Sequence, residues 1–374
     1  MKDVLVTGAT GVLGSALIPL YLDEPDTVLR LLVRAGSAQH LNERVDKLLG
    51  FWGPRYNDAP YRNRVIPLRG DVTLPNLGLA AADYQSITAE VTHIVHAAAN
   101  VNMKMTEAEA KRISVDSTCE VLQLAEQARQ SGQLEKLDYV STLGIAGKRR
   151  GRIPEVDDLG PRAFNTTYES SKAEAEEHVL AKMKDGLPIT IHRPSMIVGA
   201  SEDGKIRQFQ IFYYICEFLT GKYTSGFLPD TGDTRIDTVP VDFVARVLKW
   251  SSGTSLTTGR ILHVCAGHEY AVSAKEVAER VRTMWFDACS RPVVRRIPLP
   301  VFRCFVSAVL LCRGDRGTKS LQNLKLLLDH LDVNQRFENS ATLELLQAGG
   351  IKPPAVDSYL PNVLHYYLNH RKTQ

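Results

Sequence analysis

Short apolar runs alternate with helical patterns along most of the chain. Two long stretches, Ala108–Gln130 and Tyr168–Lys184, have helical spacing. Strands that are apolar on both faces and separated by helices are typical of a parallel sheet covered on both sides. The pattern predicts an α/β fold with right-handed crossovers, a doubly wound parallel sheet (Rossmann-like). The predicted strands are Val4–Thr7, Val28–Val33, Val65–Leu68, His93–Ala97, Leu137–Val140, Ile189–His192 and Ile261–Val264.

The first strand runs into a glycine-rich turn that opens a helix. Gly8, Gly11 and Gly14 follow Val4–Thr7 in the segment TGATGVLG. The first glycine permits a tight turn, the second lets a pyrophosphate approach the backbone, and the third lets the helix pack on the strand. Free N–H groups at the helix N-terminus would bind the phosphates. Glycines also punctuate ordinary turns, but the strand–turn–helix setting predicts a dinucleotide site.

Two parts of the chain do not follow this alternation. Residues 201–235 are rich in aromatic side chains between Phe209 and Phe227, and the part from about 271 to 374 is largely helical in pattern, with helical spacing over 320–331. We assign both to a smaller, mainly helical C-terminal substrate lobe. The dinucleotide-binding domain then comprises residues 1–200 plus about 236–270. The aromatic residues either suit an acyl or aryl chain or are ordinary core and lid packing.

Composition narrows the class of protein further. The chain has 374 residues, of which 44% are hydrophobic, and a net charge of +3, so nothing calls for a nucleic-acid partner. We expect a cytoplasmic protein, because no basic and apolar leader precedes the first strand and no apolar run reaches the length of a membrane span. Six scattered cysteines without a CxxC pair favour reduced, mostly buried thiols and give no metal site.

Two arginines follow the second predicted strand. A residue at this strand end lies beside the adenosine ribose, where an acid would favour a free 2′-hydroxyl. Arg34 would instead pair with a 2′-phosphate. Arg44, in a helical-looking stretch, is a second candidate, although either could be a solvated surface arginine. Together they favour NADPH over NADH.

The next two strand ends carry an acid and a run of small residues. Asp71 and Val72 follow the third strand, where a carboxylate could accept a hydrogen bond from the adenine amino group. Aspartate is also common in such turns for local reasons. The fourth strand runs into HAAANVN. Ala97, Ala98 and Ala99 would let a flat ligand approach, or they pack against a helix.

The strongest candidates for chemistry are Tyr168 and Lys172. Residues four apart lie on one face of a helix, and a lysine ammonium near a phenol favours the phenolate and lowers the pKa of the tyrosine. Such a tyrosine can exchange a proton with a carbonyl oxygen near neutral pH. Thr142, at the preceding strand end, can hold the same oxygen. A surface tyrosine beside a solvated lysine is the alternative, but the glycine turn upstream favours catalysis. After the next strand, Pro194 marks a loop that would pass the nicotinamide.

These motifs, in this order, resemble the extended short-chain dehydrogenase/reductase family. The matching segments are TGATGVLG, GDV, HAAA, VST, YESSK and HRPSMIVG. The finer resemblance is to the thioester-reductase and fatty acyl-CoA reductase branch. It is carried by GDVTLPNLGL (70–79), HAAANVN (96–102), LVRA with the downstream Glu43-Arg44, and DTVPVDFV (237–244). The resemblance covers about residues 1–270.

The resemblance implies roles for individual residues. One departure concerns the long helix: many relatives have NVxGT where this chain has Ser114 to Thr118, so the relay role of that asparagine does not carry over. The pyrophosphate would be lined by Gly8, Thr10, Gly11, Val12, Leu13 and Gly14, the 2′-phosphate by Arg34 and Arg44, the adenine by Asp71 and Val72, and the rest of the cofactor by Ala97, Ala98, Ala99, Tyr168, Lys172, Pro194 and Ser195. The catalytic residues would be Thr142, Tyr168 and Lys172.

The resemblance also implies a reaction. We expect NADPH-dependent reduction of an acyl thioester, bound to CoA or to a carrier protein, to an aldehyde, with a second hydride carrying the product to an alcohol as an open alternative. The thioester would arrive in trans. The same residues could serve a ketone/alcohol oxidoreductase of the sterol, flavonoid or nucleotide-sugar type. A non-catalytic NADP-sensing module would need the glycine turn but not Tyr168 and Lys172, so their presence argues against it.

One apolar stretch of the C-terminal part has several interpretations. Ile297–Cys312 is interrupted only by Arg303, is too short to span a bilayer, and is followed by Arg313, Arg316 and Lys319. We expect a helix there. It is either a buried helix of the substrate lobe, a lid whose cations meet CoA or carrier phosphates, or a peripheral membrane contact.

Overall fold

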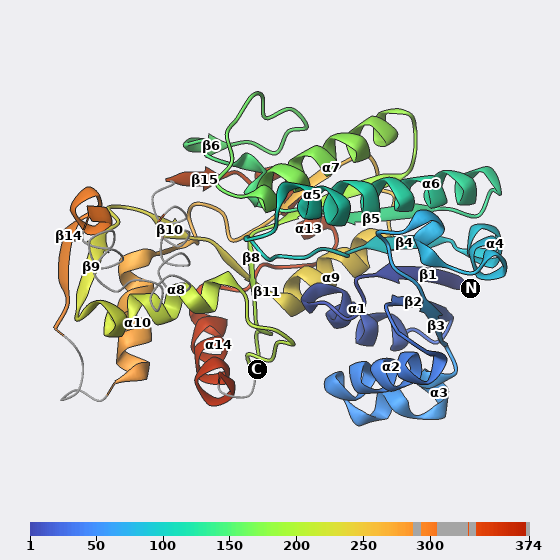
Figure 1. Cartoon of the computed structure of the whole chain (residues 1–374), viewed down its shortest axis with the longest axis horizontal. Helices are drawn as coiled ribbons and strands as arrows, with labels where there is room; N and C mark the ends of the chain where they lie inside the picture. Colours follow the sequence, from blue (N-terminus) through green and yellow to red (C-terminus); the bar gives the residue numbers. More distant parts are fainter. Residues whose placement is uncertain (287–292, 305–327, 329–333, 372–374) are drawn as a thin grey trace.

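A seven-stranded parallel sheet forms the centre of the computed structural model, which describes residues 1–286, 293–304, 328 and 334–371 (Figure 1). The strand order is β3-β2-β1-β4-β5-β7-β12, and every pairing is parallel. All seven predicted strands are confirmed, as is the doubly wound sheet. The order reverses between β1 and β4, which is where such sheets bind ligands. The strands are β1 (Lys2–Thr7), β2 (Thr27–Val33), β3 (Val65–Arg69), β4 (His93–His96), β5 (Lys136–Val140), β7 (Ile189–Pro194) and β12 (Ile261–Val264).

Helices cover both faces of the sheet, as its apolar strands require. On one face, α1 packs against α2 and α9, and on the other, α6 packs against α4 and α7. Each face has its own buried apolar cluster. The helices are α1 (Val12–Leu22), α2 (Ala38–Trp52), α3 (Ala59–Arg62), α4 (Ala81–Glu90), α5 (Glu107–Lys111), α6 (Ser117–Gln130), α7 (Thr167–Lys184) and α9 (Val241–Ser252).

The long helix predicted over Ala108–Gln130 is interrupted by a wider turn. After α5, residues Arg112–Asp116 form a π-helical segment, and α6 continues from Ser117. The Thr118 hydroxyl donates to the Ser114 carbonyl oxygen at 2.6 Å. The π-helical segment therefore presents backbone acceptors to side chains of α6, which a regular pattern of apolar spacing does not reveal.

A second group of elements lies beyond the carboxyl ends of the strands, at the far end of the molecule from α4 (Figure 1). Helices α8, α10 and α14 pack together there, whereas α13 is not at that end and lies alongside the main sheet, on β12. The described α-helices and strands not yet named are α8 (Ile211–Leu219), α10 (Ala274–Trp285), α13 (Ser340–Ala348), α14 (Val356–His370), and the strand pairs β6 (Gly151–Ile153) with β15 (Gln335–Phe337), β8 (Met196–Val198) with β11 (Thr238–Pro240), β9 (Phe227–Asp230) with β14 (Arg295–Pro298), and β10 (Arg235–Ile236) with β13 (Val272–Ser273).

The predicted helix over Ile297–Cys312 is only partly tested. Ile297 belongs to strand β14, which corrects the start of the helix, and residues 299–304 are helical. Strand β14 forms there because it pairs in parallel with β9. The rest of the stretch lies outside the described residues, as do Arg313, Arg316, Lys319 and all of 320–331 except Leu328.

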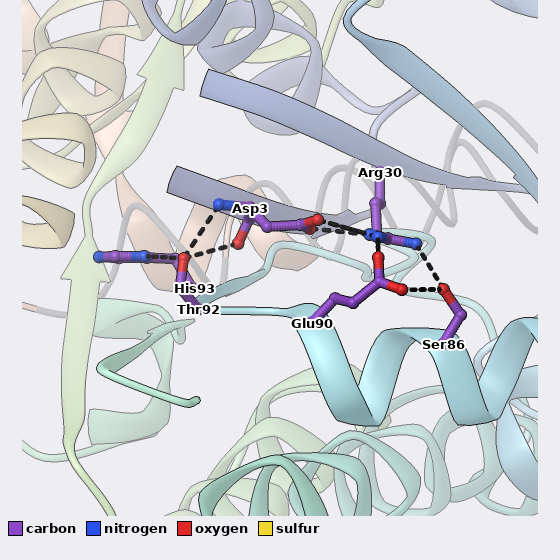
Figure 2. A network of polar contacts seen from close by, with 6 residues as sticks. All are labelled: Asp3, Arg30, Ser86, Glu90, Thr92 and His93. Atoms are coloured by element: carbon purple, nitrogen blue, oxygen red, sulfur yellow. Dashed lines mark hydrogen bonds and ion pairs between the residues drawn. The ribbon is translucent and has the colours of Figure 1, made fainter. Parts of the chain in front are cut away.

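A buried ionic network ties β1 and β2 to α4 (Figure 2). Arg30 Nε donates to Asp3 Oδ1 at 2.8 Å, and both residues are at most 6% exposed. The guanidinium also donates to Ser86 Oγ at 3.3 Å and contacts the Glu90 carboxylate. The Asp3 backbone N–H donates to Thr92 Oγ1 at 3.0 Å. Asp3 lies near the start of β1, at the opposite end of the strand from the glycine turn. We therefore assign this network to the stability of the fold and not to the binding of a ligand.

Among the described residues, none of the helices combines the length and the apolar character of a membrane span, and the His, Cys, Asp and Glu side chains form no group that could hold a metal ion. The four described cysteines are unpaired, with Cys216 and Cys265 buried and Cys119 and Cys304 exposed. Cys289 and Cys312 lie outside the described residues.

Candidate active site

A cavity of about 340 Å³ opens over the carboxyl ends of β1, β4, β5 and β7. Parallel strands bring their ends to one edge of the sheet, so residues far apart in sequence meet here. Ten residues predicted for the site line this cavity: Gly11, Val12, Leu13, Ala97, Ala99, Thr142, Tyr168, Lys172, Pro194 and Ser195.

The glycine turn is packed so tightly that side chains are excluded from two positions. Gly8 has φ of +69°, and a Cβ there would lie 2.5 Å from the Ala97 carbonyl oxygen and 2.6 Å from the Ala98 nitrogen. A Cβ on Gly14 would lie 2.3 Å from the Gly8 carbonyl oxygen. Gly8 thus serves the turn, and Gly14 lets α1 pack on it, as predicted.

The start of α1 fits a pyrophosphate. Gly11 is its N-cap residue and provides no capping side chain, and Gly11, Val12 and Leu13 line the cavity. Helix N-terminal amides that no side chain caps are suited to bind phosphate groups. Thr10 lies in the turn just before. The cradle therefore fits a dinucleotide, with Gly11 to Leu13 as the residues that would hold its phosphates.

The residues predicted around the adenosine lie at the same edge of the sheet but outside the cavity wall. Arg34 is exposed just after β2, and Arg44 of α2 donates to the Arg34 carbonyl oxygen. Asp71 Oδ1 accepts from the Thr73 backbone N–H at 3.0 Å and from its hydroxyl at 2.9 Å. The local role that the sequence left open for Asp71 is thus present, and Val72 packs against the apolar cluster of the α6 face.

Arg207 was not predicted and lies near these arginines. Its guanidinium carbon is 5.4 Å from the centre of the Phe51 ring of α2. Burial, together with the positive charge of Arg44, lowers the pKa of Arg207. Within the described residues no ion pair joins Arg34, Arg44 or Arg207 to a carboxylate. Sequence reasoning missed Arg207 because it lies in the segment assigned to the substrate lobe.

Helix α7 positions Tyr168 at the cavity. Thr166 caps the helix by accepting from the Glu169 backbone N–H at 3.1 Å, which places Tyr168 in the first turn. The side chain of Thr142 interacts with the phenol, and both residues line the cavity. Thr142 Oγ1 also accepts from the Gly144 backbone N–H at 3.1 Å, so its orientation is fixed from the strand end. The two hydroxyls that were predicted to share a substrate oxygen are therefore adjacent.

The protonation of Tyr168 differs from the expectation. Burial, together with the negative charge of Glu169, raises the pKa of Tyr168 to about 12, although the Thr142 side chain acts in the opposite direction. The expected lowering by Lys172 is wrong, because the lysine amine turns elsewhere. Lys172 Nζ donates to the Val140 carbonyl oxygen at 2.8 Å and to the Tyr139 hydroxyl at 3.2 Å. The phenol is consequently a neutral hydrogen-bond donor at pH 7.

The pKa of Lys172 is also shifted from its usual value. The residue is 2% exposed, and burial lowers its pKa to about 8, although the negative charge of Glu176, one turn along α7, opposes this shift. Glu176 is paired with the buried Arg193 of β7, whose Nε lies 3.1 Å from Glu176 Oε1. Lys172 is thus mostly protonated at neutral pH but close to titration.

Part of the remaining cavity wall comes from residues 201–235, which were assigned to the substrate lobe, and part comes from segments that were given no place in the site. The aromatic run 209–227 packs mainly in the core: Phe209 and Tyr213 lie against Tyr367 of α14, with ring centres 4.6 and 4.9 Å from the Tyr367 ring. That supports the packing interpretation of the run. The wall is instead mixed, with apolar Met103, Leu143, Met196, Ile211 and Phe337 beside polar Asn165, Gln208, Gln210, Arg235, Asp237 and His268.

Asp237 is the most unusual of these polar residues. Its carboxylate accepts from the backbone N–H groups of Ala266 and Gly267 at 3.0 and 2.9 Å. Burial raises its pKa to about 6 in spite of these hydrogen bonds. Asp237 belongs to the DTVPVDFV segment, whose resemblance to a family does not predict that this side chain lines the cavity.

A parallel sheet of this order, with a glycine-rich turn after β1 and with Thr142, Tyr168 and Lys172 in the cavity, defines the extended short-chain dehydrogenase/reductase class of nicotinamide-dependent oxidoreductases. Residues 6–248 match the NAD-binding family described as Male sterility protein, and the chain belongs to this family. The resemblance seen in the sequence is therefore confirmed.

Individual relatives and solved structures agree with this assignment. The chain is 30% identical to the isonitrile lipopeptide synthase of Streptomyces coeruleorubidus over 98% of this chain and 24% of that protein. It is 28% identical to glycine betaine reductase ATRR of Emericella nidulans over 76% of this chain and 22% of that protein. It is also 28% identical to the putative fatty acyl-CoA reductase CG8303 of Drosophila melanogaster, over 71% and 55%. The chain thus spans about a quarter of the length of the first two.

Among solved structures, the terminal R domain of the myxalamid PKS-NRPS pathway superimposes with a TM-score of 0.81 at 25% identity, covering 100% of this chain and 92% of that one. A thiolation-reductase di-domain from an archaeal non-ribosomal peptide synthetase shares the fold, with a TM-score of 0.76 at 19% identity over 99% and 76%.

Proposed function

We propose that this chain reduces an acyl thioester to an aldehyde with NADPH. The observation that carries the proposal is the protonated Tyr168 phenol beside Thr142, in the cavity that the start of α1 also lines. A protonated phenol is the form that donates a proton to a developing oxyanion, as a reduction requires. The names of the relatives, which include a fatty acyl-CoA reductase and peptide synthetases, support a thioester as the substrate.

The chain's own residues divide the work between binding and proton transfer. Gly11, Val12 and Leu13 would hold the pyrophosphate, and Arg34 and Arg44 the 2′-phosphate. When bound, NADPH supplies a hydride to the carbonyl carbon.

Tyr168 donates its proton to the carbonyl oxygen while Thr142 donates a hydrogen bond to it, and Lys172, which also lines the cavity, would hold the nicotinamide ribose. Tyr168 takes the proton back as the hemithioacetal collapses. The carbon–sulfur bond then breaks, the thiolate takes a proton from solvent, and the aldehyde is released.

The mixture of apolar and polar residues in the cavity wall indicates which acyl groups the cavity can bind. Ile211, Met196 and Phe337 offer apolar contacts, whereas Gln208 and Gln210 offer amide groups. Such a wall suits an acyl chain that carries hydrogen-bonding groups as well as apolar ones. We propose that the thioester is presented on CoA or on a carrier protein. The sequence alternatives, a ketone/alcohol oxidoreductase and a non-catalytic sensor, use the same turn and are separated by the experiment below.

The test is NADPH consumption with an acyl-CoA, a ketone and no substrate, measured by absorbance. Tyr168→Phe should lower thioester turnover by about 10²- to 10⁴-fold and leave NADPH binding nearly unchanged, because the phenol acts only on the reacting oxygen. Tyr214→Phe is the matched control, since this tyrosine is 51% exposed on α8. Turnover of the ketone alone would favour the alternative enzyme, and near-normal turnover by Tyr168→Phe would refute the role of the phenol.

A further inference from the structure

The amine of Lys172 is held by two acceptors behind the cavity wall. Its Nζ donates to the Val140 carbonyl oxygen and to the Tyr139 hydroxyl, and it lies 4.6 Å from the centre of the Tyr139 ring. Lys172 and Tyr139 are 2% and 1% exposed. Two of the three ammonium hydrogens are thereby used on β5, and one remains for the cavity that Lys172 lines.

The Tyr139 hydroxyl also has a polar neighbour on α6. The Thr118 side chain lowers the pKa of Tyr139, against the effect of burial. Thr118 donates its own hydrogen to the Ser114 carbonyl oxygen at 2.6 Å, so toward Tyr139 it can only accept. The hydrogen of the Tyr139 hydroxyl can therefore turn toward Thr118, while its oxygen accepts from Lys172.

A buried histidine extends this chain of hydrogen bonds to the glycine turn. His96 Nε2 lies 3.4 Å from Thr118 Oγ1, and His96 Nδ1 lies 2.7 Å from Thr7 Oγ1. Burial and the charge of Lys172 lower the pKa of His96 to about 3, so the ring is neutral. The His96 ring also stacks on the Tyr139 ring, with centres 5.7 Å apart and planes inclined by 28°. Thr7 immediately precedes Gly8 in the turn.

We propose that Tyr139 is a positioning residue for the reaction: its hydroxyl keeps Lys172 protonated and fixed, and the chain Thr118–His96–Thr7 fixes that hydroxyl. Only the expected effect of Tyr139 on turnover rests on the proposed function. Its structural part, the control of the Lys172 amine by Tyr139, stands on the hydrogen bonds alone. Tyr139 has no place in the cavity wall and does not touch the substrate.

Other titratable groups also surround Lys172, and the test must separate them from Tyr139. Glu176 favours the protonated amine but is already paired with Arg193. His96 is neutral. Removing the Tyr139 hydroxyl changes none of these groups directly. Cys119 of α6 and Tyr168 of α7 act on Tyr139 itself, and Glu169 acts on Tyr168.

The experiment compares Tyr139→Phe with Tyr21→Phe. Both tyrosines are fully buried, and Tyr21 bonds to Ser252 Oγ at 2.7 Å away from the cavity. The phenylalanine at 139 keeps the ring stacking and the contact of the ring face with the amine. The pKa of Lys172 is measured in the cofactor-free protein by NMR of ε-¹³C-labelled lysine, with Lys172→Met identifying the resonance.

We expect Tyr139→Phe to lower the pKa of Lys172 by about one unit, because a buried ammonium loses one of two charge-assisted hydrogen bonds. Tyr21→Phe should leave it unchanged. The alkaline limb of the pH profile of kcat/KM should move by the same amount. An unchanged Lys172 pKa in Tyr139→Phe, or an equal shift in Tyr21→Phe, would overturn the proposal.

A second variant keeps the proposal testable if Tyr139→Phe does not fold. Thr118→Val keeps the shape of the side chain but removes the hydroxyl that acts on Tyr139. The freed hydroxyl hydrogen can then point to the amine, which favours neutral Lys172 and lowers its pKa. A protein that shows these shifts without thioester reduction would refute the proposed function and leave this inference standing; activity without the shifts would do the reverse.

Discussion

At the level of single residues, Tyr168 and Lys172 are both protonated at neutral pH although their pKa values are shifted in opposite directions. Burial acts on both: it disfavours the phenolate and raises the pKa of Tyr168 to about 12, and it disfavours the ammonium and lowers the pKa of Lys172 to about 8. Tyr168 is therefore set to donate a proton, and Lys172 carries a positive charge at the same pH. This suits the reductive direction better than the oxidative one.

These shifts predict the pH dependence of the reduction. Activity should be nearly constant around pH 7 and fall above about pH 8, because Lys172 loses its proton there while Tyr168 keeps its own. A profile of kcat/KM against pH measures this limb. In Lys172→Arg, any remaining activity should not fall near pH 8, since the guanidinium stays charged. A limb at the same pH in that variant would assign it to another group.

Arg34 carries a prediction about the cofactor. Arg34→Ala should weaken NADPH binding by about tenfold or more and barely change NADH binding, because a charge-assisted bond to the 2′-phosphate contributes about 1.5–3 kcal/mol. Titration of the purified protein with each cofactor measures both. Arg246→Ala on α9, whose side chain is 51% exposed, is the control. An equal loss for both cofactors would make Arg34 a structural residue.

The sequence predicts the reactive side chains but not the residues that hydrogen-bond to them. Helical spacing places Tyr168 and Lys172 on one face, and the end of β5 brings Thr142 to them. The acceptors of Lys172 could not be predicted, since Tyr139 comes from a strand about thirty residues earlier and its hydroxyl direction depends on Thr118 of α6. Arg207 and Asp237 were missed for a similar reason: only the fold brings those segments to this edge of the sheet.

At the level of elements, the packing of α1 on the glycine turn controls both stability and binding. Gly14→Ala would put a Cβ 2.3 Å from the Gly8 carbonyl oxygen, so α1 must move away from the turn. We expect a loss of about 1–3 kcal/mol in the free energy of unfolding, together with weaker NADPH binding. Urea denaturation and a cofactor titration measure the two effects.

Gly36→Ala is the matched control, because a Cβ at this loop position would meet nothing within 4 Å. It should leave the free energy of unfolding and NADPH binding nearly unchanged. If Gly14→Ala has the same free energy of unfolding and the same NADPH affinity as Gly36→Ala, the contact between α1 and the turn does not exclude a side chain at residue 14.

The predicted elements differ in how well local pattern determines them. The seven strands are short apolar runs between turns, a signal that is local, and all were found. The π-helical segment Arg112–Asp116 and strand β14 were not predicted. The first keeps helical spacing apart from one wider turn, and the second exists only because β9, some seventy residues earlier, pairs with it. Both depend on tertiary contacts that apolar spacing does not encode.

At the level of the whole molecule, one group of polar side chains lies at the carboxyl ends of the parallel strands and another lies toward their amino ends. The carboxyl edge holds the cavity, with the perturbed Tyr168, Lys172 and Asp237. The network around Asp3 and Arg30 lies toward the other edge, among β1, β2 and α4 (Figure 2). Chemistry and one of the main polar anchors of the fold are therefore separated by the length of the strands, which allows stability to be changed without touching the site.

This separation gives the last prediction. Arg30→Met should lower the free energy of unfolding by about 3–5 kcal/mol, because it leaves the Asp3 carboxylate, 6% exposed, without its buried partner. The double variant Asp3→Leu with Arg30→Met should recover most of that loss, since no buried charge remains. Urea denaturation gives the three free energies. Well below the unfolding transition, NADPH binding and thioester turnover should match the unaltered protein in both variants. A double variant no more stable than Arg30→Met would show that Glu90, Ser86 and Thr92 need the pair for their own placement, and a loss of turnover in the folded double variant would show that the two edges are coupled through β1.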